Sequence, residues 1–404
     1  MSPQTSPPAP RFPLSARHAL FGAVTVVLAL AAIRAPRGEA QRPARDETVV
    51  ARVPARSSVE VRALEAAEAT AASDPGDPRR ALALARRYIE ASRREGDPRY
   101  LGAAEAALAR ITAVAEPGPE VRLLRATILQ ARHAFDAALV ELDHALAERP
   151  DDAQAWLTRA TVWTVKGNYQ EARASCLKLA PLVSPALGVA CTAPIEGLTG
   201  HTELARTELE RGIATARSND ERAYLRSLLG ERAFWQGELG EAERQLRATL
   251  TLDGGDRYTR ALLADVLLDA GRPEEVATLL SERGGDDALA LRRALADLAR
   301  GQKDSEDVRR VSEGFAASRL RGDSVHQREE ARLWLARGDA VRALHFARAS
   351  WAVQHEAWDA RLLLEAAAAA NQPAAATPVL TWLATTGFES PRLRSLAANL
   401  REDR

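Results

Sequence analysis

The sequence has little lysine, few aromatic residues and no excess of charge of either sign. Only Lys166, Lys178 and Lys303 are lysines among 404 residues, aromatic residues make up 5%, and the formal net charge is zero. Proteins that bind nucleic acids usually carry an excess of basic charge for phosphate contacts, so we expect no nucleic-acid partner. The residues that favour strands are sparse while alanine and leucine dominate, and this composition predicts an all-α fold.

Recognisable catalytic motifs are also missing. The seven histidines are scattered and form no His-Glu-x-x-His pattern. The sequence contains neither a glycine-rich phosphate loop ending in Gly-Lys-Ser/Thr nor a Gly-x-Ser-x-Gly motif. We therefore expect a protein that is not an enzyme, with no catalytic residues, no cofactor and no metal site.

The first forty residues contain one apolar run. Residues 19–33 carry no charge and follow a basic start, a pattern typical of a secretory signal peptide. The run is short for a membrane span, which needs about 20 apolar residues. We expect residues 1–40 to be a signal peptide or, alternatively, an uncleaved anchor with its basic end in the cytoplasm. The first option gives an exported protein, periplasmic or secreted. The second gives a chain anchored in the inner membrane of a bacterium. Residues 41–57, rich in proline and arginine, are expected to be a disordered linker.

The sequence around Gly167 predicts a helix hairpin. Trp156, Ala160 and Trp163 are spaced four and three apart, so they share one face of a helix. Gly167 can end that helix, because only glycine enters the left-handed conformation without a steric cost. Ala172 then lies on the inner face of a second helix, where a small side chain lets the two backbones approach.

The hairpin pattern repeats along the chain. The same glycine-to-alanine spacing occurs at Gly200 with Ala205, Gly237 with Ala242 and Gly338 with Ala343. The turn positions His133, Gly167, Gly200, Gly237 and Gly271 follow one another at steps of about 34 residues. In period and in hairpin unit the sequence resembles the tetratricopeptide repeat (TPR) family. The resemblance implies a right-handed α-solenoid of stacked antiparallel helix hairpins. It would span residues 58–404, with about eight repeats and a capping helix over residues 390–402.

The resemblance also implies where a partner would bind. In TPR proteins the first helix of each pair lines a concave groove, and we expect a protein or peptide partner there. The outward positions of these helices give the candidate partner-binding residues Glu231, Phe234, Trp235, Tyr258, Asp265, Arg328, Arg332 and Arg361. Phe234 and Trp235 are the strongest candidates, because large aromatic residues dominate interface hot spots. The alternative is that one of these two is core and that the arginines are solvated or paired with nearby acids.

The two cysteines lie on either side of one predicted turn. Cys176 is near the end of one helix and Cys191 near the start of the next. Opposed positions on neighbouring helices can satisfy disulfide geometry, and export would allow oxidation. The alternative is two buried cysteines that never pair. With no Cys-x-x-Cys spacing, a metal or redox-catalytic role is not expected.

Two functional hypotheses follow. The first is an exported, non-catalytic scaffold that binds a protein or peptide in its groove. The second is a structural assembly factor of the cell envelope, associated with the membrane through residues 19–33 and working through multimerisation. The sequence leaves the oligomeric state open.

Overall fold

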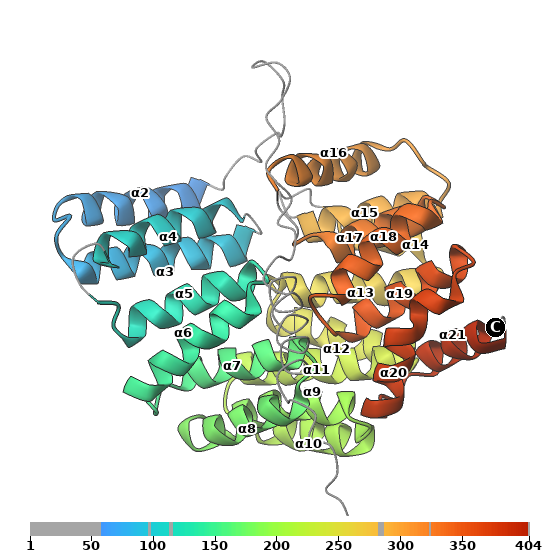
Figure 1. Ribbon diagram of the computed structural model, residues 1–404, viewed down its shortest axis with the longest axis horizontal. Coiled ribbons are helices and arrows are strands. Elements are labelled where there is room, and N and C mark those ends of the chain that lie inside the picture. The colour runs from blue at the N-terminus through green and yellow to red at the C-terminus, as the bar shows by residue number, and fades with distance from the viewer. Residues whose placement is uncertain (1–57, 96–97, 113–115, 282–286, 323–324, 403–404) are drawn as a thin grey trace, which may run out of the picture. The chain divides into compact units, whose positions relative to one another are not determined.

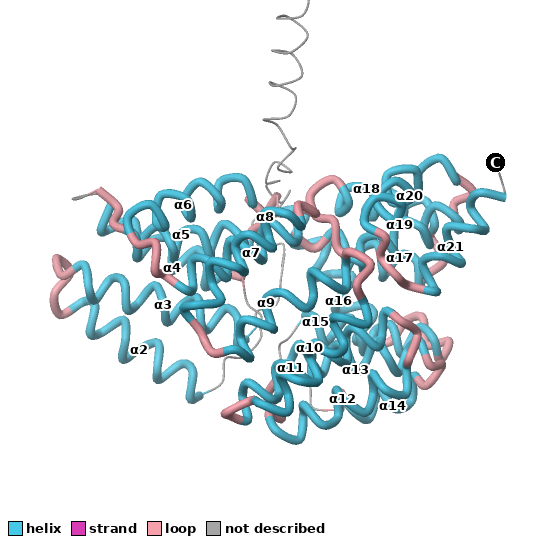
Figure 2. Tube along the Cα trace, turned by 90° about the horizontal axis from the view of Figure 1, so that it is seen from below, coloured by secondary structure: helices cyan, strands magenta, loops and turns pink. Residues whose placement is uncertain are grey.

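The structure, a computed structural model, describes residues 58–95, 98–112, 116–281, 287–322 and 325–402. Every regular element within these ranges is a helix: 20 α-helices and two short 3-10 helices, η1 (Ala180–Leu182) and η2 (Pro373–Ala376). Figure 2 shows these helices joined by loops, with no strand in the described part of the chain. The prediction of an all-α fold is confirmed. The expected leader, residues 1–40, and the expected linker, residues 41–57, lie outside the described residues.

Internal contacts divide the chain into two units, Met1–Val50 with Ala316–Ser324 and Ala51–Phe315 with Val325–Arg404. In the first unit, the structure describes residues 316–322, the last part of α16 (Glu306–Leu320) and the turn after it. All packing described below lies within the second unit. None of the described helices is both long enough and apolar enough to cross a membrane.

Consecutive helices of the second unit pack as antiparallel pairs (Figure 1). The first helices of the pairs are α3 (Pro78–Glu95), α5 (Pro119–Ala131), α7 (Ala153–Val165), α9 (Pro185–Leu198), α11 (Asn219–Trp235), α13 (Arg257–Asp269), α15 (Asp287–Ala299), α17 (Gln327–Ala336) and α19 (Ala357–Ala369). The second helices are α4 (Arg99–Thr112), α6 (Phe135–Glu148), α8 (Tyr169–Leu179), α10 (Thr202–Thr215), α12 (Leu239–Leu252), α14 (Pro273–Leu279), α16, α18 (Ala340–Trp351) and α20 (Thr377–Thr386). The helix α2 (Ser58–Ala72) precedes the pairs, and α21 (Pro391–Glu402) follows them.

The pairs stack on one another in chain order. Each first helix from α3 to α17 contacts the first helix of the next pair, so that these helices form one continuous row. A single pair leaves one apolar side uncovered, and its neighbours cover it, so the stability of such an array is a sum of unit and interface terms. The fold is therefore an α-solenoid of helix hairpins.

Small residues occupy the close contacts within the pairs. Ala138, Ala172, Ala205, Ala242 and Ala343, each five residues after its turn position, are all at most 1% exposed. A larger side chain at these positions would push the two helices of the hairpin apart, because protein interiors are close-packed. The recurring alanine thus fixes the distance between paired helices.

The turns between paired helices use the left-handed backbone conformation. Gly167 and Gly237 have φ angles of 75° and 78°, and each follows the last turn of a first helix. At the earliest of the repeated turn positions His133 takes this conformation, with φ of 56°. A non-glycine residue is strained there by about 1–2 kcal/mol. The ring of His133 stacks on Phe135, with ring centroids 5.4 Å apart, and this contact offsets part of the strain.

A disulfide joins Cys176 on α8 to Cys191 on α9, with 5.6 Å between the Cα atoms. It links the second helix of one pair to the first helix of the next. Both residues are buried, and η1 lies in the turn between them. The sequence left open whether the two cysteines form a disulfide or stay as unpaired buried thiols, and the structure has the disulfide.

The end of the row of first helices lies against its middle. The backbone N–H of His355, in the loop before α19, donates to the carbonyl oxygen of Val165 at 2.7 Å. The indole N–H of Trp382 on α20 donates to the hydroxyl of Tyr169 at 3.0 Å. Two turn glycines also meet, since a Cβ at Gly200 would lie 3.0 Å from the carbonyl oxygen of Gly387. These contacts join residues nearly 200 positions apart in the sequence, and a partly open space lies between the first helices.

Candidate functional site

The space between the first helices is a cavity of about 320 Å³. Residues of six successive first helices line it, from α9 to α19, together with residues of α10, Thr164 of α7 and Phe388 after α20. Its volume lies at the lower end of the range for small-molecule pockets, which is roughly 300–1,000 Å³. The row of first helices is the face on which the TPR resemblance places a partner.

Helical spacing accounts for the way side chains gather on the cavity. Glu231 and Trp235 are four residues apart on α11, and Arg328 and Arg332 are four apart on α17. Residues four apart lie on the same face of a helix. The starts of two lining helices are fixed by caps: Asp256 accepts the Thr259 N–H at α13, and Ser218 accepts the Glu221 N–H at α11.

A buried ion-pair cluster forms one wall of the cavity. Asp265 on α13 is 1% exposed and pairs with Arg292 on α15 at 2.7 Å and with Arg332 on α17 at 2.6 Å. Burial raises the pKa of this carboxyl, but the two guanidinium groups more than offset that effect, so that the pKa lies below its usual value. The cluster ties three successive first helices together and keeps Asp265 ionised.

Arg328 joins α17 to the start of α19. Its guanidinium contacts the carboxylates of Glu356 and Asp359, the latter at 2.6 Å. These two acids also form the capping box of α19, in which the Glu356 side chain accepts the backbone N–H of Asp359 and the Asp359 side chain accepts the backbone N–H of Glu356. The positive charge of Arg328 is therefore compensated twice.

Trp358 also lines the cavity and is the aromatic residue on which its neighbours pack. The guanidinium carbons of Arg332 and Arg361 lie 4.2 and 4.8 Å from the centroid of its ring, within cation–π range. Phe234 stacks on Trp358 at 5.6 Å, and Trp235 meets it edge-on at 5.4 Å. Because Trp358 contacts α11 and α17, it holds two sides of the cavity at a fixed distance.

Glu231 faces the cavity without an ion pair among the described residues. Burial raises its pKa, interactions with the Tyr258 and Trp235 side chains partly offset that effect, and the negative charge of Glu356 adds to it. The neighbouring ring of Tyr258 lines the same cavity and is 56% exposed. Tyr224, about two helical turns before Glu231 on α11, is 47% exposed. Burial raises the pKa of Tyr224, and the negative charge of Glu231 raises it further.

Glu329 on α17 is a second lining carboxylate with no ion pair in the part of the chain that the structure describes. Burial raises the pKa of Glu329, but the charges of Arg328 and His326 lower it by more than burial raises it, so that the net shift is downward. The side chain is therefore an anion at neutral pH.

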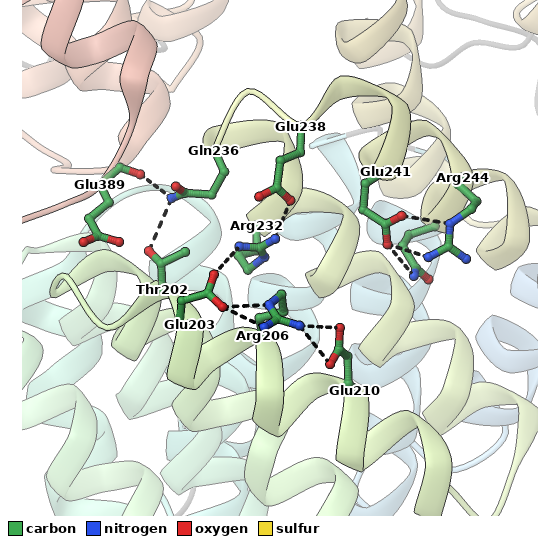
Figure 3. Close-up of polar contacts among 11 residues, drawn as sticks. Thr202, Glu203, Arg206, Glu210, Arg232, Gln236, Glu238, Glu241, Arg244 and Glu389 are labelled. Carbon is green, nitrogen blue, oxygen red and sulfur yellow. Dashed lines mark hydrogen bonds and ion pairs between the residues drawn. The ribbon is translucent and has the colours of Figure 1, made fainter.

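A polar network borders the cavity where α10 meets α11 (Figure 3). Gln236 donates to the hydroxyl of Thr202 and to the backbone carbonyl of Glu389. Arg232 pairs with Glu238 and lies 3.9 Å from Glu203. Among the described residues, the Nε and Nη1 atoms of Arg232 have no hydrogen-bond partner, and they have no exposed surface. This arginine therefore presents no free donor to a ligand.

The structure brings most of the sequence-predicted candidates together. Six of the eight line the cavity: Glu231, Trp235, Tyr258, Asp265, Arg328 and Arg332. Phe234, expected at an outward position, is instead 5% exposed, because Trp358 from α19 packs on it. Arg361 lies behind the wall, 9% exposed, and pairs with Asp269 at 2.7 Å. Binding of a partner by any of these residues stays a prediction.

Other lining residues were not predicted from the sequence. Glu329 stands between two predicted arginines, and Trp358 lies three residues before Arg361, so the same helical spacing could have found both. Phe388 follows α20 and reaches the cavity only through the contacts between distant helices, for which the repeat period gives no signal. Within the described ranges, no group of three or more His, Cys, Asp or Glu side chains could hold a metal ion.

Comparisons with known proteins find likeness at the level of structure only. No protein-family model matches the sequence, and no curated protein matches it either. A Rap protein solved in complex with Competence and Sporulation Factor is 15% identical, covers 80% of this chain and 87% of its own, and gives a TM-score of 0.47.

Two further solved structures are similar at lower TM-scores. The hetero-tetramer Cut9–Hcn1 of the APC/C is 14% identical over 76% of this chain, with a TM-score of 0.42, and the match spans 52% of that chain, about half its length. A tetratricopeptide repeat protein from Parabacteroides merdae is 13% identical, covers 62% of this chain and 98% of its own, and has a TM-score of 0.37. Likeness at these scores carries no argument about function, so the description of this chain as a helix-hairpin solenoid rests on its own packing.

Proposed function

We propose that the protein is an exported, non-catalytic scaffold that binds an extended segment of a partner protein in the cavity between its first helices. The observation that carries the proposal is the exposed Tyr258 side chain beside the Glu231 carboxyl on the lining of the cavity. Apart from the Glu329 carboxylate, the other aromatic and charged side chains of the lining are already packed or paired. Aromatic surface and a lone carboxylate that face a cavity are groups to which a ligand can add contacts.

Two features favour a segment of chain over a folded partner. The cavity of about 320 Å³ accommodates a few side chains. A rigid frame of buried ion pairs around Asp265 and Arg328 also holds the cavity open before binding, which reduces the entropic cost of binding.

Site-specific photocrosslinking tests this proposal. A benzoylphenylalanine placed at Tyr258 should give adducts with a partner in cells that express the full chain. The matched control is the same crosslinker at Leu177, an apolar residue of α8 that is 64% exposed and does not line the cavity. Adducts of the same kind and yield from both positions, or none from position 258, would show that the cavity is not the binding surface.

Export is proposed from residues 19–33, and cell fractionation with N-terminal sequencing tests it. A mature chain that starts near Gln41 supports the soluble exported form. An intact Met1 in the membrane fraction supports the alternative, an anchored assembly factor of the cell envelope. A chain with an intact Met1 in the cytoplasmic fraction would contradict both.

A further inference from the structure

We propose that the cavity receives a basic side chain, arginine or lysine, of the partner segment, with Glu231 and Glu329 as its counter-charges and the Tyr258 ring as its wall. This inference rests on the proposed function and adds the chemistry of the ligand to it.

Three of the arginines that line the cavity are already paired with carboxylates. Arg292 and Arg332 share Asp265, and Arg328 contacts both Glu356 and Asp359. Their side chains are between 9% and 20% exposed. Because their guanidinium groups are occupied by carboxylates, an acidic ligand would have to displace an existing buried ion pair.

The fourth lining arginine also offers no positive charge to the cavity. Arg232 has a side chain 7% exposed and is paired with Glu238. Its two nitrogen atoms without hydrogen-bond partners have no exposed surface. An anion in the cavity could not reach them, so they do not argue for an acidic ligand.

The lining carboxylates without an ion pair are Glu231 and Glu329, on α11 and α17. An arginine or lysine side chain would give these two carboxylates an ion-pair partner, and charge complementarity of this kind is worth more in a partly buried site than in open water. Glu356 lies on the same lining and pairs there with Arg328.

The aromatic surface suits the same ligand. A cation is attracted to the face of an aromatic ring, and the aliphatic stem of arginine or lysine packs on apolar walls. Tyr258 is 56% exposed and lies beside Glu231, and Leu228, Leu262 and Ala261 supply apolar lining. The cavity volume matches one long side chain with its neighbours.

Pools of capped pentapeptides test the inference on the full chain. The central residue is arginine, lysine, citrulline, norleucine or glutamate, and the other four positions are randomised. We expect the immobilised protein to retain the arginine and lysine pools about tenfold more strongly than the citrulline and norleucine pools, and the glutamate pool least. Citrulline has the shape of arginine without the charge, so the comparison isolates the charge. The preference should weaken as salt is added.

Variants separate the carboxylates from the rest of the surface. Glu231→Gln should reduce retention of the arginine pool about tenfold and leave the norleucine pool unchanged. Glu274→Gln, an exposed glutamate of α14 outside the cavity, is the matched control and should behave as wild type.

The failure of this inference is distinguishable from that of the proposed function. Retention of peptides regardless of the central residue, with adducts at Tyr258 still formed, would overturn the basic-ligand inference and leave the scaffold proposal standing. Retention of no pool, together with no adduct at position 258, would overturn both. Agmatine, a small cation with the arginine headgroup, is tested alone as well. If it bound as tightly as the arginine peptides, the ligand would be a small cation and not a side chain of a partner segment, which would overturn the inference.

Discussion

The indole N–H of Trp382 donates to the hydroxyl of Tyr169 at 3.0 Å, across a separation of 213 residues. The same hydroxyl donates to the carbonyl oxygen of His355 at 3.4 Å. Burial raises the pKa of Tyr169 far above its usual value, which keeps the hydroxyl protonated and able to do both. One side chain thus connects three segments of the second unit.

Tyr169→Phe should therefore destabilise the protein by about 1–3 kcal/mol, because it leaves the buried N–H of Trp382 without an acceptor. Chemical denaturation followed by circular dichroism measures the change. Tyr224→Phe removes a hydroxyl from a half-exposed ring on α11 and should change stability by less than about 0.5 kcal/mol. Equal effects of the two variants would mean that the Tyr169 hydroxyl adds nothing.

The disulfide between Cys176 and Cys191 closes a loop with a sequence separation of 15. In the chain-entropy account such a crosslink stabilises by about 3 kcal/mol. The double variant Cys176→Ala and Cys191→Ala should unfold at a lower denaturant concentration than the oxidised wild type, by roughly that free energy. The wild type in reductant should approach the double variant. Identical midpoints with and without reductant would contradict a crosslink that constrains the unfolded chain.

Two glycines with equal space around them should respond oppositely to alanine. A Cβ at Gly237 or Gly240 would meet nothing within 4 Å, but only Gly237 has a positive φ, of 78°. Gly237→Ala should cost about 1–2 kcal/mol, because the left-handed conformation is strained for alanine. Gly240→Ala, inside α12, should be neutral or stabilising by up to about 1 kcal/mol. Thermal unfolding of both variants checks the prediction, and a Gly237→Ala variant as stable as wild type would refute it.

Asp265→Asn should be strongly destabilising, by about 3–5 kcal/mol, because Arg292 and Arg332 would lose their buried counter-charge. Since the folded pKa of Asp265 lies below its unfolded value, the stabilisation is present above about pH 4 and is lost as the pH falls through the folded pKa. Denaturation midpoints over an acidic pH series measure this. Asp304→Asn, at an exposed position, is the control, and a similar loss from both variants would count against the ion-pair explanation.

Glu231→Gln should instead stabilise the protein near neutral pH. The folded pKa of Glu231 is raised by burial, so its contribution to stability is present below the unfolded pKa and is lost as the pH rises through the folded pKa. The neutral amide avoids that loss, and the difference between variant and wild type should vanish below about pH 4. Thermal midpoints at both pH values test the sign. A variant less stable than wild type at neutral pH would show that the carboxylate stabilises the fold.

The local part of the fold could be predicted from the sequence, because each hairpin carries its own signal. Gly167 and Ala172 mark a turn and a close contact that depend only on nearby residues. The same helical spacing predicted that Tyr258 and Asp265 share a face, and both line the cavity. The side of each first helix that faces the cavity could therefore be predicted from the sequence.

The distant contacts could not be predicted in this way. A repeat period describes neighbours, and nothing in it places Trp382 beside Tyr169 or Trp358 against Phe234. For that reason Phe234 was expected at the surface and is buried. The ionisation of the lining carboxylates depends on those same contacts, since burial and the charges of distant helices set their pKa values.

The bonds from Val165 and Tyr169 to His355 and Trp382 also restrict how such a chain can change in length over evolution. Open hairpin arrays gain and lose whole units easily, because a new unit needs to match only the unit before and the unit after it. Here, a duplication or deletion anywhere between α9 and α18 would carry the partners of Tyr169 out of reach. The number of hairpins in that interval is thus held constant by geometry, while hairpins before α7 remain free to multiply.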